Sequence, residues 1–204
     1  GITLTEEAAK ANPITFTIGS TDVTVKAVFE KKEAVIINFN VLNFTYDGTQ
    51  KTPEIGPEEV VGMDRTIEYF DSLNNKLKSA PTEAGTYKVK VTFTSSEASE
   101  YRKTWADATF TIARAEQTAP AAPTPTNATS NSFELDIVAE QEYVISTTQA
   151  TPAESEWKQG TELTSPVTGL EPAKWYYVYT RKAGDANHNP SEAVNSAIKT
   201  LDTY

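Results

Sequence analysis

The stretch Gly169-Leu-Glu-Pro-Ala-Lys-Trp-Tyr-Tyr-Val-Tyr-Thr180 decides the fold of the C-terminal half of this chain. A turn that holds glycine and proline leads into a run of aromatic and β-branched residues, which is typical of a β-strand. Side chains alternate between the two faces of a strand, so one set faces a core and the other faces outward. The predicted core face carries Tyr176, Val178 and Thr180. The predicted outer face carries Trp175, Tyr177 and Tyr179.

A second stretch in the N-terminal half has the same design. Residues 84–93 read Ala-Gly-Thr-Tyr-Lys-Val-Lys-Val-Thr-Phe, a turn glycine followed by strict alternation. The pattern places Tyr87 on the core face as a structural anchor, like the tyrosine corner of immunoglobulin-like domains, and leaves Lys88 and Lys90 in water. Two strands of one design in separate halves of the chain favour two β-domains in tandem.

Composition agrees with thin β-sandwiches and excludes several partners. Only 38% of the 204 residues are hydrophobic although 10% are aromatic, as expected where alternate strand positions face water. A net charge of −10 argues against nucleic acid and anionic lipid as partners, because binding to either needs a basic surface.

The absence of cysteine favours a bacterial or intracellular origin. No signal peptide and no apolar run of membrane-spanning length is visible. The chain begins with Gly1 instead of Met, so we expect an excerpt of a longer protein.

We predict an all-β fold of tandem β-sandwiches joined by a proline-rich linker. The predicted units are a β-hairpin remnant of a preceding repeat at 1–33, one sandwich at 34–116 and another at 117–204. Prolines 120, 123 and 125 favour a semi-rigid extended linker. A short helix is also predicted near the N-terminus. Further strands are expected at 35–39, 44–46, 66–70, 86–93, 109–112, 132–137, 143–146, 166–169 and 197–201.

Three family resemblances follow from motifs in this order. The pair Asn12-Pro-x-x-Phe16 and Val23-Thr-Val-x-Ala-x-Phe29 resembles the end of an internalin-type B repeat. The segments Phe44-x-Tyr-Asp-Gly48, 83–93 and 110–115 resemble the MBG-type repeat, an immunoglobulin-like module found in tandem in bacterial surface proteins and adhesins. The long charged stretch 95–106 departs from that pattern.

The third resemblance covers the C-terminal module. The spacing Leu170-x-Pro172-x-x-x-Tyr176 is similar to the fibronectin type III signature, in which the tyrosine hydroxyl bonds back to the preceding loop. Bacterial variants of this module carry further matching positions in the same order, namely Tyr143, Ile145, Trp157, Gly169 and Arg181. This resemblance makes Leu170, Pro172 and Tyr176 structural anchors.

Catalytic and metal-binding motifs are weak. The chain has one histidine and no cysteine, so a nucleophile with a histidine base would have to use His188, which we interpret as an exposed loop residue. The segment Asp185-x-Asn187-x-Asn189 resembles the opening of a calcium loop. It has Pro190 in place of glycine and Ser196 in place of the closing glutamate, so an Asx-rich turn is the better interpretation. We predict no catalytic residue, no metal and no cofactor.

The outer-face row of Trp175, Tyr177 and Tyr179 is the candidate ligand site. Alternate residues of a strand lie about 7 Å apart, near the spacing of successive sugar rings, so the row could stack on a glycan or dock a protein. The alternative is that Tyr143, Trp157, lysine stems or a neighbouring module cover these rings.

These observations favour a non-catalytic structural or adhesive module of a bacterial surface or secreted protein, a spacer or display stalk outside the cell. Its expected partners are the neighbouring modules of the parent chain and a glycan or protein of the host or the cell wall. Nucleic-acid binding and membrane insertion are not expected. A carbohydrate-binding accessory module of a glycan-degrading enzyme is the alternative.

Overall fold

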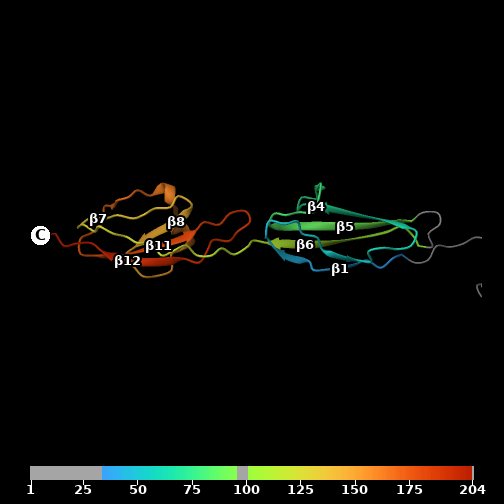
Figure 1. The fold of residues 1–204 in the computed structure, drawn as a ribbon, viewed down its shortest axis with the longest axis horizontal. Coiled ribbons are helices and arrows are strands. Elements are labelled where there is room, and N and C mark those ends of the chain that lie inside the picture. The colour runs from blue at the N-terminus through green and yellow to red at the C-terminus, as the bar shows by residue number, and fades with distance from the viewer. Residues whose placement is uncertain (1–33, 96–100, 204) are drawn as a thin grey trace, which may run out of the picture.

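The structure is a computed structural model that describes residues 34–95 and 101–203. The predicted N-terminal helix and the hairpin predicted within 1–33 lie outside the described residues. Two β-sandwiches follow each other along the long axis of the molecule, and the chain leaves the second sandwich at the end that faces away from the first (Figure 1). The described residues contain no α-helix, so the predicted all-β class of tandem sandwiches is confirmed.

Six strands build the first sandwich. They are β1 (Asn38–Asn40), β2 (Asn43–Thr45), β3 (Glu54–Gly56), β4 (Met63–Phe70), β5 (Gly85–Ser95) and β6 (Thr104–Ala113). One sheet has the order β2-β6-β5-β4, in which β2 runs parallel to β6, and β1 pairs with β3 in the opposite layer. The buried core residues of this sandwich are Ile55, Val89, Val91, Phe93, Phe110 and Ile112.

Alternation along β5 divides the two faces as the sequence predicts. Val89, Val91 and Phe93 are fully buried. Between them, the ammonium groups of Lys88 and Lys90 lie on the outer face, 5.5 Å from the ring centre of Phe70 and 5.0 Å from that of Trp105 respectively. The ammonium groups of these lysines therefore lie over aromatic rings of the outer face, although Trp105 stays 58% exposed.

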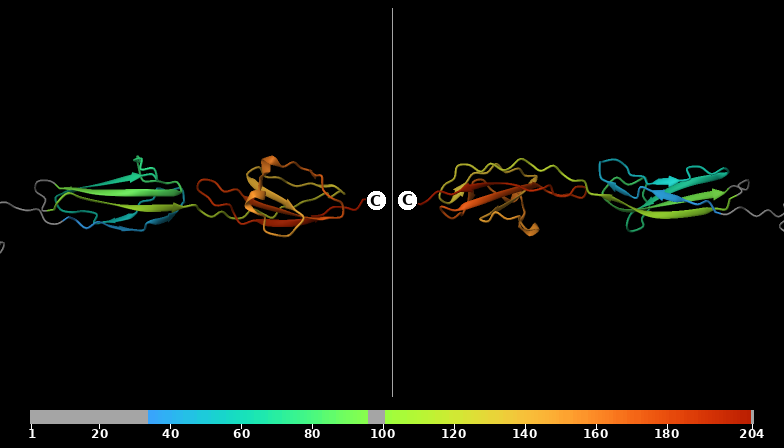
Figure 2. Two further views of the ribbon diagram at one scale, coloured as in Figure 1. Left: turned by 180° about the vertical axis from the view of Figure 1, so that it is seen from behind. Right: turned by 90° about the horizontal axis from the view of Figure 1, so that it is seen from below.

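The second sandwich contains β7 to β12 and two single-turn 3₁₀ helices. The strands are β7 (Ser132–Phe133), β8 (Gln141–Ser146), β9 (Lys158–Gln159), β10 (Val167–Thr168), β11 (Trp175–Lys182) and β12 (Val194–Lys199), and the turns are η1 (Glu154–Glu156) and η2 (Gly160–Glu162). One sheet has the order β12-β11-β8-β9, and β10 pairs with β7 in the other. Figure 2 shows the two sandwiches in tandem from two further sides. Its buried core residues are Phe133, Leu135, Tyr143, Tyr176 and Val178.

The strands predicted for the first sandwich differ most from the structure at β6 and β3. Strand β6 begins at Thr104, several residues before the predicted start. The prediction missed this part of the strand because alanines occupy its core-facing positions 106 and 108. Alanine carries too little apolar signal to reveal the alternation, although Trp105 pairs in register with Thr92. Strand β3 was not predicted, because Ile55 is its only large apolar residue. The predicted domain limits at 33/34 and 116/117 stay predictions.

Two tyrosine hydroxyls tie the sandwiches to their own loops. The hydroxyl of Tyr87 donates to the carbonyl oxygen of Glu83 at 3.0 Å. A Cβ on Gly85 would lie 3.3 Å from that hydroxyl, so glycine leaves room for the ring. In the second sandwich, the hydroxyl of Tyr176 accepts the backbone N–H of Glu171 at 2.8 Å. Each bond fixes the loop that enters a central strand.

Removing the second of these bonds tests its contribution. In Tyr176→Phe the ring still fills the core beside Phe133, but the N–H of Glu171 loses its acceptor. We expect the free energy of unfolding of the second sandwich to fall by about 1 kcal/mol, the usual net value of one hydrogen bond. Urea denaturation followed by circular dichroism measures it. Tyr177→Phe on the outer face is the control, and an equal loss in both variants would contradict the assignment.

Candidate functional site at the joint between the sandwiches

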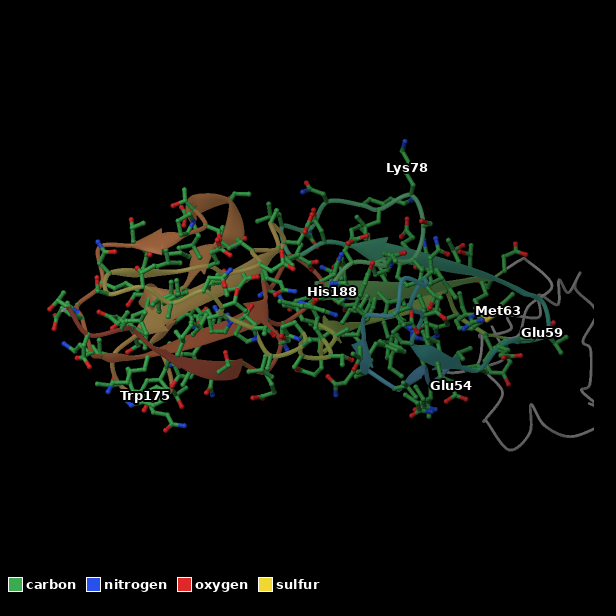
Figure 3. The ribbon with its side chains drawn as sticks, turned by 60° about the vertical axis from the view of Figure 1, so that its left-hand side comes forward. Glu54, Glu59, Met63, Lys78, Trp175 and His188 are labelled. Atoms are coloured by element: carbon green, nitrogen blue, oxygen red, sulfur yellow. The ribbon has the colours of Figure 1, made fainter. Side chains whose placement is uncertain are left out.

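The structure separates the three rings of the predicted ligand row. Trp175 is 52% exposed at the far end of the second sandwich (Figure 3), Tyr177 is half-buried, and Tyr179 is only 4% exposed. Exposed aromatic surface on this strand is therefore confined to Trp175 and part of Tyr177. It does not extend over three rings.

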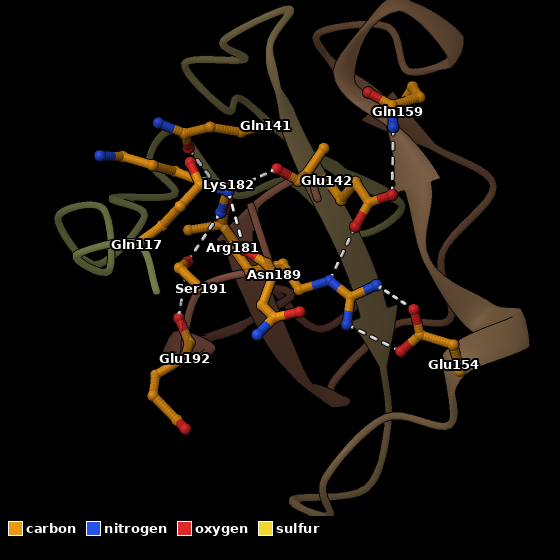
Figure 4. Close-up of polar contacts among 12 residues, drawn as sticks. Gln117, Gln141, Glu142, Glu154, Gln159, Arg181, Lys182, Asn189, Ser191 and Glu192 are labelled. Atoms are coloured by element: carbon orange, nitrogen blue, oxygen red, sulfur yellow. Dashed lines mark hydrogen bonds and ion pairs between the residues drawn. The ribbon is translucent and has the colours of Figure 1, made fainter. Parts of the chain in front are cut away.

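Arg181 and the side chains bound to it occupy the other end of this outer face. Its Nε donates to Glu142 at 2.7 Å, and its two terminal nitrogens donate to both carboxylate oxygens of Glu154 at 2.8 and 2.7 Å (Figure 4). The guanidinium carbon lies 4.3 Å from the ring centre of Trp157. The segment 154–157 therefore lies over the end of the face at which Tyr179 and its cross-strand neighbour Val144 are buried. Cover by Trp157 was one of the alternatives that the sequence left open.

The predicted anchors occupy different environments. Tyr87 and Tyr176 make the hydroxyl bonds described above, and Leu170 packs against the second core. Pro172 is exposed in the turn before β11, so it takes no part in core packing.

The loop between β11 and β12 carries the only histidine of the chain. We call residues 183–190 the joint loop, because they contact the first sandwich. The Oδ1 atom of Asp185 accepts the backbone N–H groups of Asn187 and His188, each at 2.7 Å, which is an Asx-type turn. These bonds, with the hydrogen bond to the His188 ring as the largest cause, hold the pKa of the Asp185 carboxyl below its usual value. The loop closes tightly, since a Cβ on Gly184 would lie 2.8 Å from Pro190.

Backbone atoms of the joint loop pair with the chain that leaves the first sandwich. The N–H of Ala115 donates to the carbonyl oxygen of Asn187 at 2.8 Å, and the N–H of Asn189 donates to the carbonyl oxygen of Ala115 at 2.9 Å. Together they form a parallel β-bridge between Ala115 and His188. The linker residue Gln117 adds two bonds from its side-chain amide, to the carbonyl oxygens of Ala183 and Asn189 at 2.8 and 2.9 Å.

Two asparagine side chains extend the joint to the end of the first sandwich. The Asn187 amide accepts the N–H of Ala84 at 2.8 Å and donates to the carboxylate of Glu83. The Asn189 amide donates to Glu116 at 2.7 Å. Both asparagines that looked like calcium-loop positions are therefore engaged with the first sandwich and its exit.

The His188 ring lies between the two sandwiches (Figure 3). It packs edge-on against Tyr46, with the ring centres 5.2 Å apart, and its Nδ1 lies 3.0 Å from each carboxylate oxygen of Asp185. Its side chain is 35% exposed, so the prediction of a simple exposed loop residue misses its packing role. The contact between the His188 and Tyr46 rings therefore adds aromatic packing to the hydrogen bonds of the joint.

Two kinds of feature are absent from the described residues. Within 34–95 and 101–203, no three histidine or acidic side chains are grouped so that they could hold a metal ion. Across the same residues, no helix has the length and apolarity needed to cross a membrane.

Comparisons with known proteins add no family assignment. No family model matches the chain, and no curated protein matches it. A two-domain fibronectin type III segment of chicken tenascin is similar over 81% of this chain and 98% of its own, with 13% identity and a TM-score of 0.38. The chicken CNTN1 FN1–FN3 domains are similar over 88% of this chain and 71% of their own, with 11% identity and a TM-score of 0.31. At these TM-scores, the fold description rests on the strand order and packing of the chain itself.

The Arg181 cluster leads to a stability prediction. Arg181→Met removes the cation while leaving the Glu142 carboxylate, whose side chain is only 16% exposed, without its charged partner. We expect the second sandwich to lose about 2–4 kcal/mol of unfolding free energy, as when one member of a largely buried pair is removed. Glu154→Gln is the control. Glu154 is 76% exposed, so we expect its removal to cost under about 1 kcal/mol. Urea denaturation gives both values, and equal losses would refute the cluster's role.

The same cluster predicts a pH dependence. The hydrogen bonds from Arg181 lower the pKa of the Glu154 carboxyl below its ordinary value of 4.5. The ion pair therefore stabilises the folded state fully at a pH above the ordinary pKa of a glutamate. This stabilisation is lost as the pH falls through the lowered pKa of Glu154. We expect urea melts between about pH 6 and pH 3 to show a larger drop in stability for the native chain than for Glu154→Gln. Parallel curves for the two proteins would contradict this assignment.

Proposed function

We propose that this chain is a non-catalytic structural segment of a bacterial cell-surface or secreted protein, in which tandem sandwiches act as a spacer or display stalk. The main support for this proposal is the contact between the two sandwiches. There the joint loop binds the end of the first sandwich through backbone, amide and ring contacts. Two modules connected in this way hold their far ends apart. The Phe44–Gly48 and Leu170–Tyr176 motifs support MBG-type and fibronectin type III-like modules respectively.

The local geometry of both motifs agrees with this proposal. Phe44 and Tyr46 pack against the first core, and Asp47 accepts the N–H of Thr49 at 2.9 Å in the turn that follows. The Tyr176 hydroxyl bond is the feature that the fibronectin type III signature implies. The proposed location is the bacterial surface or the extracellular medium, and the proposed partners are neighbouring modules together with a host or cell-wall glycan or protein.

The carbohydrate-binding alternative has a smaller surface than the sequence predicted. Trp175 is the most exposed ring of the row, while Tyr179 is buried and unable to stack on a sugar. Within this row, Trp175 is the one exposed tryptophan and offers one stacking position, so we place the spacer role first.

Surface display tests the spacer role. The chain is anchored to a carrier cell through its C-terminus, with an epitope at its N-terminus, beneath a surface polysaccharide layer. We expect a bulky antibody-coated bead to capture these cells. A Gly/Ser chain of about 50 residues is the control, because its end-to-end distance of about 40 Å falls short of the span of two sandwiches whose central strands have 11 and 8 residues. Equal capture with the coil would refute the role, and capture that depends on Trp175 and a free glycan would favour the alternative.

A further inference from the structure

The joint loop and the end of the first sandwich form a specific docking surface, and we propose that this surface locks the two modules into one rigid body. This inference goes beyond the spacer role, because a spacer can also be flexible. The partner that the surface recognises is a loop of the following module with the pattern Asp-x-Asn-His-Asn.

The first argument is the number of independent anchors. A proline-containing linker alone restricts bending but leaves rotation about the linker open. Here the chain that leaves the first sandwich pairs with the joint loop in a β-bridge at Ala115. The Asn187 amide reaches a separate element, the loop before β5, at Ala84 and Glu83. Tyr46, which follows β2, supplies a third contact through the His188 ring. Contacts to three elements fix both bend and rotation.

The second argument is donor–acceptor matching. Asn187 uses both ends of its amide, since its oxygen accepts from Ala84 and its nitrogen donates to Glu83. An aspartate at position 187 could still accept the N–H of Ala84. Its other carboxylate oxygen would face the Glu83 carboxylate, where Asn187 places its N–H₂ group. Like charges in direct contact repel, so the surface selects asparagine over aspartate at this position.

The third argument is that the loop holds its own shape. The Asx-type turn at Asp185 and the tight Gly184–Pro190 closure use bonds within the loop. A preorganised loop loses little conformational freedom on docking, so more of its contact energy remains to hold the modules together. Rigid coupling therefore does not require a bound ion.

Distance measurements between two spin labels test the proposal. The chain has no cysteine, so cysteines introduced at the exposed positions Lys78 and Gln149 label one site in each sandwich. We expect a single narrow distance distribution in the native background. Asn187→Asp should broaden it at least twofold, because repulsion from Glu83 opens the joint. A broad distribution in the native background would overturn the proposal.

Two further variants separate the joint from general effects. Glu83→Gln combined with Asn187→Asp restores a donor facing an acceptor, and it should return the narrow distribution. Asn195→Asp makes the same charge change on an exposed position of β12 outside the joint loop, and it should leave the distribution narrow. Circular dichroism confirms that each variant is folded. A narrow distribution in the Asn187→Asp variant, or no rescue by Glu83→Gln, would show that the asparagine pair does not lock the modules.

Discussion

Burial of alternate side chains on two central strands is the constraint on which the rest of the structure depends. Strands β5 and β11 each bury a row of core-facing residues, and every other strand of its sandwich packs around that row. Thin sandwiches bury few residues, so the loops that enter these strands need additional ties. The hydroxyl bonds of Tyr87 and Tyr176 provide them. The two modules therefore solve the same stability problem in the same way, with a tyrosine near the start of the central strand.

Much of this arrangement could be predicted from the sequence, because the informative residues are large and periodic. The alternation around Val89, Val91 and Phe93 and the Tyr176 anchor carry strong local signals. The prediction was incomplete where core positions are small, as in the alanines of β6, or where a strand has a single apolar residue, as in β3. The outer face of β11 also shows a limit of periodicity, since alternation separates faces but does not say what covers them. Tyr179 is on the predicted face and is nevertheless buried.

The joint could not be predicted, for a physical reason. Asn187 lies 104 residues from Glu83 in the chain, so no local spacing connects them. The segment drew attention because alternating Asp and Asn oxygens also suit calcium. In the structure the same side chains serve as donors and acceptors toward protein groups, and Asp185 shapes the loop instead of holding an ion. The polar composition of a loop therefore shows that it makes hydrogen bonds, while its partners depend on the fold.

The side-chain hydrogen bonds of Asn187 and Asn189 across the joint pair neutral amides with the backbone N–H of Ala84 and with the carboxylates of Glu83 and Glu116, and none of these bonds involves lysine or arginine. Salt screens attraction between opposite full charges most strongly, and it acts little on short-range hydrogen bonds between a dipole and a charge. At a net charge of −10, added salt also weakens the repulsion between the two acidic modules. The joint therefore depends less on ionic strength than an interface held together by lysine or arginine ion pairs.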